Sequence, residues 1–129
     1  MKLEHIAINV PDPTAMAKWY AENLEMQIVR AAGEPRYEHF IADKNRQSVM
    51  EIYHNSAAPI PDYSQVHPLM LHFAFLVDNM EETHARLVKA GATPVGEITT
   101  TPAGDQLAFL KDPWNVSIQL VKRQKPLVA

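Results

Sequence analysis

An internal repeat constrains the fold of this chain more than any other feature of its sequence. Residues 3–10 (LEHIAINV) resemble residues 70–77 (MLHFAFLV), and each segment carries one histidine, His5 in the first and His72 in the second. A turn and a helical pattern follow each segment. Self-similarity of this kind predicts two modules of the same architecture.

In the first module, apolar residues alternate with polar or small ones over residues 6–10, which is the period of a β-strand. Asp12 followed by Pro13 is typical of a helix start, and the helix is expected to run to about Asn23. Three further strands are expected near residues 27–31, 37–42 and 48–53, separated by turn-forming segments.

The second module repeats this order. A strand is expected over residues 72–77, and Asn79 with Glu82 three residues later forms the pattern of a capped helix start. Gly91 is a typical stop for that helix. Three strands are then expected near residues 93–98, 106–110 and 116–121. The order is therefore βαβββ, twice.

These elements predict an α+β fold, with residues 1–129 as one domain. We expect module one over about residues 1–54 and module two over about residues 70–123. Residues 55–69 hold several prolines and polar residues and are predicted to connect the modules.

Composition excludes several classes of function. The net charge is −3 with no long basic run, which argues against a nucleic-acid partner. The chain has no cysteine, so disulfides, thiolate nucleophiles and cysteine-ligated zinc are excluded. No apolar segment has the length of a membrane span, and no apolar signal region begins the sequence. We expect a soluble cytoplasmic protein without a membrane partner.

A second polar residue extends the repeat. Glu51 lies about 46 residues after His5, and Gln119 lies about 47 residues after His72, each between apolar residues of an expected strand. Strand alternation places all four side chains on the sheet face that does not pack against the helices. A buried carboxylate requires a cation or a strong donor, so this set predicts a metal site. Structural histidines and a glutamine that bonds across the sheet remain the alternative.

The same residues occur in a wider pattern that resembles the vicinal oxygen chelate superfamily, the glyoxalase/bleomycin-resistance/dioxygenase group. The resemblance covers roughly residues 3–122. It rests on the strands of His5, Glu51 and His72, on the helix that follows His72, and on two further motifs, Trp19-Tyr20-x-x-x-Leu24-x-Met26 and Phe109-x-x-Asp112-Pro113. It implies two βαβββ modules in an open, cupped mixed sheet with helices on the outer face. It also implies a divalent metal bound by His5, Glu51, His72 and Gln119, and a homodimer.

Two departures from the family pattern bear on structure and chemistry. Asn115 stands in the turn where the family often has glycine, and we expect it to adopt the left-handed conformation. Gln119 stands where many metal enzymes of the family carry glutamate. An amide cannot exchange protons in the usual pH range, so only Glu51 of the predicted ligands can act as a general base.

The resemblance and the ligand set together predict a glyoxalase-like lyase or isomerase that acts on a small carbonyl compound through a metal-stabilised enolate. Nickel, cobalt, manganese or zinc would be the metal. Two alternatives remain open: a non-catalytic, drug-resistance-type binding protein, and an iron(II) dioxygenase built on two histidines and Glu51. Arg30, His39 and Tyr53 are the predicted substrate contacts.

Overall fold

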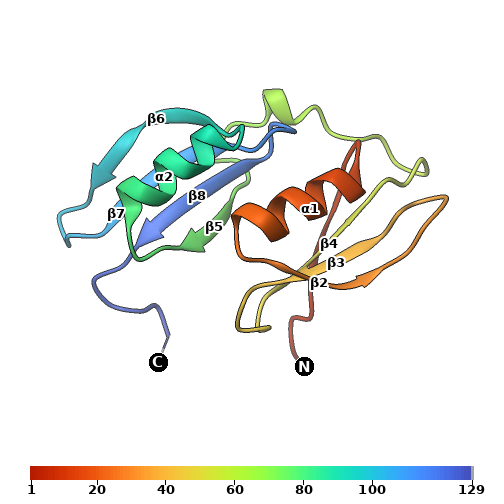
Figure 1. The fold of residues 1–129 in the computed structure, drawn as a ribbon, viewed down its shortest axis with the longest axis horizontal. Helices are drawn as coiled ribbons and strands as arrows, with labels where there is room; N and C mark the ends of the chain where they lie inside the picture. Colours follow the sequence, from red (N-terminus) through yellow and green to blue (C-terminus); the bar gives the residue numbers. More distant parts are fainter. Residues whose placement is uncertain (129) are drawn as a thin grey trace. The chain divides into compact units, whose positions relative to one another are not determined.

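The computed structural model describes residues 1–128 and divides the chain into two compact units, Met1–Pro61 and the part from Asp62 onward (Figure 1). The first unit contains β1 (Ile6–Asn9), α1 (Pro13–Asn23), β2 (Gln27–Ala31), β3 (His39–Ala42) and β4 (Val49–Tyr53). The second contains a 3-10 turn η1 (Tyr63–Gln65), β5 (Phe73–Leu76), α2 (Met80–Lys89), β6 (Thr93–Thr100), β7 (Gln106–Lys111) and β8 (Ser117–Lys122). The predicted βαβββ order is confirmed in both units.

Each unit forms one open, mixed four-stranded sheet, with strand order β1-β4-β3-β2 in the first and β5-β8-β7-β6 in the second. The first strand of each unit pairs in parallel with the last, and the other neighbours are antiparallel. This pairing sets Ala7 opposite Glu51 and Ala74 opposite Gln119. The duplication in the sequence is therefore a duplication of topology and of register.

In the first unit, α1 packs against β2, β3 and β4 (Figure 1). Met16 and Tyr20 of the helix are fully buried, as are Ile41 and Ile52 of the sheet. Removing such a side chain from water contributes about 1.5–3 kcal/mol. Because successive strand residues point to opposite faces, burying Ile52 under the helix directs its neighbour Glu51 to the other face.

In the second unit, α2 packs against β8. The helix begins as predicted, since the Glu82 backbone N–H donates to the Asn79 side chain at 3.1 Å. It ends at Lys89 with Ala90 as its C-cap, and Gly91 follows with a φ of 111°, a conformation that favours glycine. Neither this helix nor any other in residues 1–128 is long and apolar enough to cross a membrane.

The turn before β8 is built around Asp112. Its carboxylate accepts hydrogen bonds from the backbone N–H groups of Trp114 (2.8 Å) and Val116 (2.9 Å), which tightens the turn. Asn115 lies between them with a φ of 68°. The predicted left-handed conformation of Asn115 is confirmed, and the turn leads directly into the strand that carries Gln119.

Candidate functional site

The first unit brings His5 and Glu51 together on the face away from α1. His5 immediately precedes β1, and Glu51 is the central residue of β4. The His5 Nε2 lies 3.6 Å from the Glu51 Oε1, too far for a good hydrogen bond and close enough for two ligands of one ion. Their side chains are 32% and 19% exposed. Ala7, in register with Glu51, leaves space beside the pair.

The surroundings of His5 leave its Nε2 unprotonated, so that the Nε2 lone pair can bind a metal. Its Nδ1 lies 2.9 Å from the Glu4 carboxylate, which accepts the Nδ1 proton. The ring also contacts Phe40 edge-on, with centroids 5.4 Å apart and planes at 84°. A carboxylate that accepts the Nδ1 proton is the arrangement that fixes the tautomer of metal-binding histidines. The His5 side chain therefore fits a ligand role.

His72 has similar surroundings in the second unit, with a backbone carbonyl in place of the Glu4 carboxylate. Its Nδ1 lies 2.8 Å from the Pro68 carbonyl oxygen, which can only accept, so Nδ1 carries the proton and Nε2 the lone pair. The ring contacts Phe109 edge-on, with centroids 5.1 Å apart and planes at 76°. The duplicated feature is thus a histidine held against a phenylalanine with its Nε2 available.

Gln119 occupies the position of Glu51 in the second unit. It is the half-buried residue of β8 in register with Ala74 and Phe109, just as Glu51 is in register with Ala7 and Phe40. Within residues 1–128 its side-chain amide makes no hydrogen bond. Its carbonyl oxygen is therefore available to a ligand, and the second unit also carries two candidate donors on one sheet face.

Neither unit holds a complete metal centre. Across the described part of the chain, no three histidine, cysteine, aspartate or glutamate side chains gather closely enough to hold an ion. Each unit supplies a pair, His5 with Glu51 and His72 with Gln119. The sequence reasoning missed the two phenylalanines that support these pairs, although an aromatic residue at matching places in both modules was a visible signal.

Arg30 and Tyr53 lie on the same sheet face as Glu51. Arg30 is in register with Phe40, and its guanidinium carbon stands 5.6 Å from the centroid of that ring. Tyr53 follows Glu51 by two residues in β4 and is half-buried. Both residues therefore share a sheet face with Glu51.

His39 lies on the opposite face of the sheet. It is only 6% exposed and is in register with Ile52, whose side chain packs under α1. Its Nδ1 is 2.6 Å from the Tyr37 carbonyl oxygen, which accepts the Nδ1 proton. The structure does not bring His39 together with the other predicted substrate contacts, because its register places it in the core.

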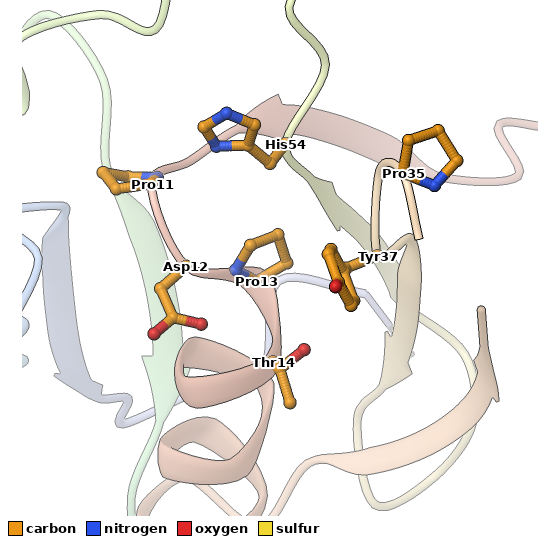
Figure 2. Close-up of a pocket in the computed structure, with 7 residues that line it drawn as sticks. All are labelled: Pro11, Asp12, Pro13, Thr14, Pro35, Tyr37 and His54. Carbon is orange, nitrogen blue, oxygen red and sulfur yellow. The ribbon is translucent and has the colours of Figure 1, made fainter. Parts of the chain in front are cut away.

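A separate pocket of about 380 Å³ opens at the start of α1, beside the end of β4. Figure 2 shows its seven lining residues: Pro11, Asp12, Pro13, Thr14, Pro35, Tyr37 and His54. The His54 Nδ1 donates to the Val10 carbonyl at 3.1 Å. Partial burial, and then the nearby Glu34 carboxylate, raises the pKa of Tyr37, whose hydroxyl donates to Glu34 at 3.2 Å. None of the predicted donors lines this pocket.

Comparison with known proteins accounts for this arrangement. A family model described as the Glyoxalase/Bleomycin resistance protein/Dioxygenase superfamily matches residues 2–120. The chain belongs to this superfamily. The predicted resemblance and the predicted fold class of two βαβββ modules are confirmed.

Individual proteins are also similar to this chain. A probable lactoylglutathione lyase of Vibrio parahaemolyticus serotype O3:K6 is 25% identical over 130 residues, 96% of this chain and 92% of that protein. A glyoxalase family protein from Bacillus cereus superposes with a TM-score of 0.82 at 17% identity, covering 95% of this chain and 93% of that one. An antibiotic binding protein from Streptomyces sp. CB03234 superposes with a TM-score of 0.72 at 18% identity, covering 96% and 97%.

Proposed function

We propose that this protein is a divalent-metal-dependent lyase or isomerase of the glyoxalase type that acts on a small carbonyl compound. The observation that carries the proposal is the His5–Glu51 pair, in which Nε2 and Oε1 lie 3.6 Å apart beside an alanine that leaves room for a ligand. The similarity to a probable lactoylglutathione lyase supports the same class of reaction.

The residues present fit a divalent metal. His5 and His72 each offer an Nε2 lone pair, Glu51 offers a carboxylate and Gln119 an amide oxygen. This mixed nitrogen and oxygen set suits nickel, cobalt, manganese or zinc. A cation bound by these residues would act as a Lewis acid that stabilises negative charge developing on a carbonyl oxygen. We therefore propose these four residues as the ligands of a divalent ion.

Glu51 is the proposed general base. Gln119 is an amide and cannot act as a general base, and the two histidines would use their Nε2 lone pairs on the metal, which leaves the Glu51 carboxylate for this role. Its side chain is mostly buried, and within residues 1–128 it receives no hydrogen bond, so its lone pairs are free to take a proton from a carbon next to a carbonyl group. Gln119, in the matching position of the second unit, would bind the metal through its amide oxygen but would not transfer a proton.

Two further candidate functions follow from specific observations. The fold similarity to an antibiotic binding protein favours a small-molecule binder as the second candidate. The third candidate is an iron(II) oxygenase, because His5, His72 and Glu51 form the two-histidine, one-carboxylate set of metal donors found in such enzymes. We also propose a homodimer as the working form, which the molar mass measured by light scattering would test.

The first experiment is elemental analysis of untagged protein after reconstitution with each metal and removal of the excess. We expect about one divalent ion per chain in the parent and none in the His5→Ala/His72→Ala variant. A His67→Gln variant, which alters an exposed histidine, is the matched control and should retain the ion. Bound iron with oxygen consumption would favour the dioxygenase, and a parent that binds no metal would refute the proposed enzyme.

The second experiment follows the proton. An isomerase or lyase of this type exchanges the hydrogen next to the substrate carbonyl with solvent, which NMR in deuterium oxide detects. Glu51→Gln should abolish that exchange while leaving the fold intact. Unchanged exchange in this variant would remove Glu51 from the mechanism.

A further inference from the structure

We propose that Arg30 binds an anionic group of the substrate, so that the protein selects carbonyl compounds bearing a carboxylate. This inference rests on the proposed function of the His5–Glu51 face and names the class of substrate that the face accepts. Four observations carry it: the row of residues to which Arg30 belongs, the bulge that aims it, the absence of a charge partner, and the neutral counterpart in the second unit.

One row of in-register residues crosses the first sheet on the face away from α1. It runs from Arg30 in β2 through Phe40 in β3 and Glu51 in β4 to Ala7 in β1. Adjacent strands are about 4.8 Å apart, so the backbones of Arg30 and Glu51 are separated by roughly 10 Å. A basic group and the proposed catalytic base therefore flank one aromatic ring at the spacing of a small molecule.

A β-bulge places Arg30 in this row. The pairing of β2 with β3 shifts between Ile28 and Arg30, so that Ile28 faces Ile41 while Arg30, two residues later, faces the adjacent Phe40. Without the extra residue, Val29 would occupy the position opposite Phe40. Bulges commonly occur beside functional sites, where they re-aim a side chain. Here the bulge brings a cation to the Phe40 ring in place of a valine.

Arg30 is held in place but is not neutralised. Its guanidinium carbon stands 5.6 Å from the Phe40 centroid, a cation–π distance, and the residue is exposed. Two other arginines have carboxylate partners, Arg36 with Glu38 at 2.9 Å and Arg123 with Asp105 at 3.0 Å. Across residues 1–128 no carboxylate lies within ion-pair distance of Arg30. Its planar fork of N–H donors is free to bind a carboxylate with two hydrogen bonds.

The second unit serves as an internal control. Its corresponding row contains Val95, Phe109, Gln119 and Ala74, with the phenylalanine kept and neither end charged. The same sheet thus forms with valine beside the ring, so folding does not require an arginine there. Arg30 and Glu51 are thus both charged in the first unit, where we propose that the proton transfer occurs, and both corresponding residues are neutral in the second.

Together these positions define the substrate class. The carbonyl end of the molecule lies at His5 and Glu51, its carbon chain crosses the Phe40 ring, and its carboxylate meets Arg30. A neutral carbonyl compound of the same size makes the first two contacts and lacks the third. We therefore expect Arg30 to raise kcat/KM for anionic substrates over neutral ones.

The kinetic test compares two hemithioacetals of methylglyoxal on the metal-loaded protein, an anionic one formed with 3-mercaptopropionate and a neutral one formed with 2-mercaptoethanol. A hydrogen bond to a charged group supports a preference of roughly 10- to 100-fold for the anionic compound. Arg30→Gln should remove most of this preference, Arg30→Lys should keep part of it, and Arg46→Gln, which alters another exposed arginine, should leave it unchanged. An unchanged preference in Arg30→Gln would overturn the inference while leaving the proposed function intact.

A binding experiment tests the Arg30 site without requiring catalytic turnover. The probes are 3-hydroxypropionate and its neutral amide, titrated into the metal-loaded protein while NMR follows the Arg30 Nε–Hε signal. We expect the carboxylate to shift this signal and the amide to leave it in place, with at least a tenfold weaker Kd for the carboxylate in Arg30→Gln. If both hemithioacetals prove inert and this pattern holds, the proposed function fails and the Arg30 site stands. If the carboxylate binds equally to parent and variant, or not at all, the Arg30 site is refuted.

Discussion

Replacing Glu51 by glutamine tests the energetics of the site as well as its chemistry. The Glu51 side chain is 19% exposed, its Oε1 lies 3.6 Å from the His5 Nε2, and it accepts no hydrogen bond from any residue in the range 1–128. A buried polar group without a partner costs roughly 1–3 kcal/mol, and a charged one costs more. The metal-free protein therefore carries a destabilising carboxylate in a position where an amide of the same size also fits.

The size of the effect follows from this partial burial. About a fifth of the side chain remains in water, so the lower end of the range applies and Glu51→Gln should raise the free energy of unfolding by about 1 kcal/mol without metal. For a chain of this length that raises Tm by about 4 °C. With metal present, the parent should instead be more stable than Glu51→Gln. An ion at a hundred times its Kd stabilises the parent by about 2.7 kcal/mol, and it binds the variant more weakly.

The assay is calorimetry at pH 8, first with a chelator and then across a metal titration. Glu38→Gln is the matched control, since Glu38 is partly exposed and ion-paired with Arg36 at 2.9 Å, and its loss should lower Tm slightly. A metal-free Glu51→Gln variant that is less stable than the parent would show that the carboxylate supports the fold. Glu51 would then not be a residue that serves function at the expense of stability.

Three further predictions concern the fold. Asn79→Ala, which removes the N-cap of α2, should lower the free energy of unfolding by about 1 kcal/mol in urea denaturation. Asn115→Ala should cost about 1 kcal/mol in the same assay because of the φ of 68°, whereas Asn115→Gly should be nearly neutral. Hydrogen bonds from the Gln124 backbone and from Arg123 lower the pKa of Asp105. Its stabilisation is therefore complete above the ordinary carboxyl pKa and is lost as pH falls through the lowered value. The stability difference between the parent and Asp105→Asn should accordingly shrink from pH 6 to pH 2.

The order of elements was predictable because local signals act alone. Alternating apolar residues, the Asp12 and Asn79 caps and the Gly91 stop each require only a few neighbouring residues. The prediction erred at the start of β3, which begins at His39 and not at residue 37. Tyr37 adopts a φ of 51°, which no strand residue adopts, and nothing in its side chain announces that conformation.

The site was less predictable because it depends on register. His39 was a reasonable substrate contact from its strand, yet pairing with Ile52 turns it into the core. Arg30 reaches the Glu51 face through a bulge that follows from the pairing of two strands and has no local signature. The matching strand positions of Glu51 and Gln119 could be predicted for the opposite reason, since the repeat gives the two units the same register.

The duplicated fold allows the two charged residues on the Glu51 face to be compared with their counterparts in the second unit. The two units share strand order, register and a histidine packed on a phenylalanine, but Glu51 and Arg30 of the first correspond to Gln119 and Val95 of the second. Since the second sheet folds with neutral residues at both places, the fold alone does not require the charges of the first. Glu51, a half-buried carboxylate that receives no hydrogen bond within residues 1–128, instead carries a cost in stability. That cost is the physical reason for our proposal that proton transfer belongs to the first unit, and the unpaired charge of Arg30 on the same face is the reason for proposing anion binding there.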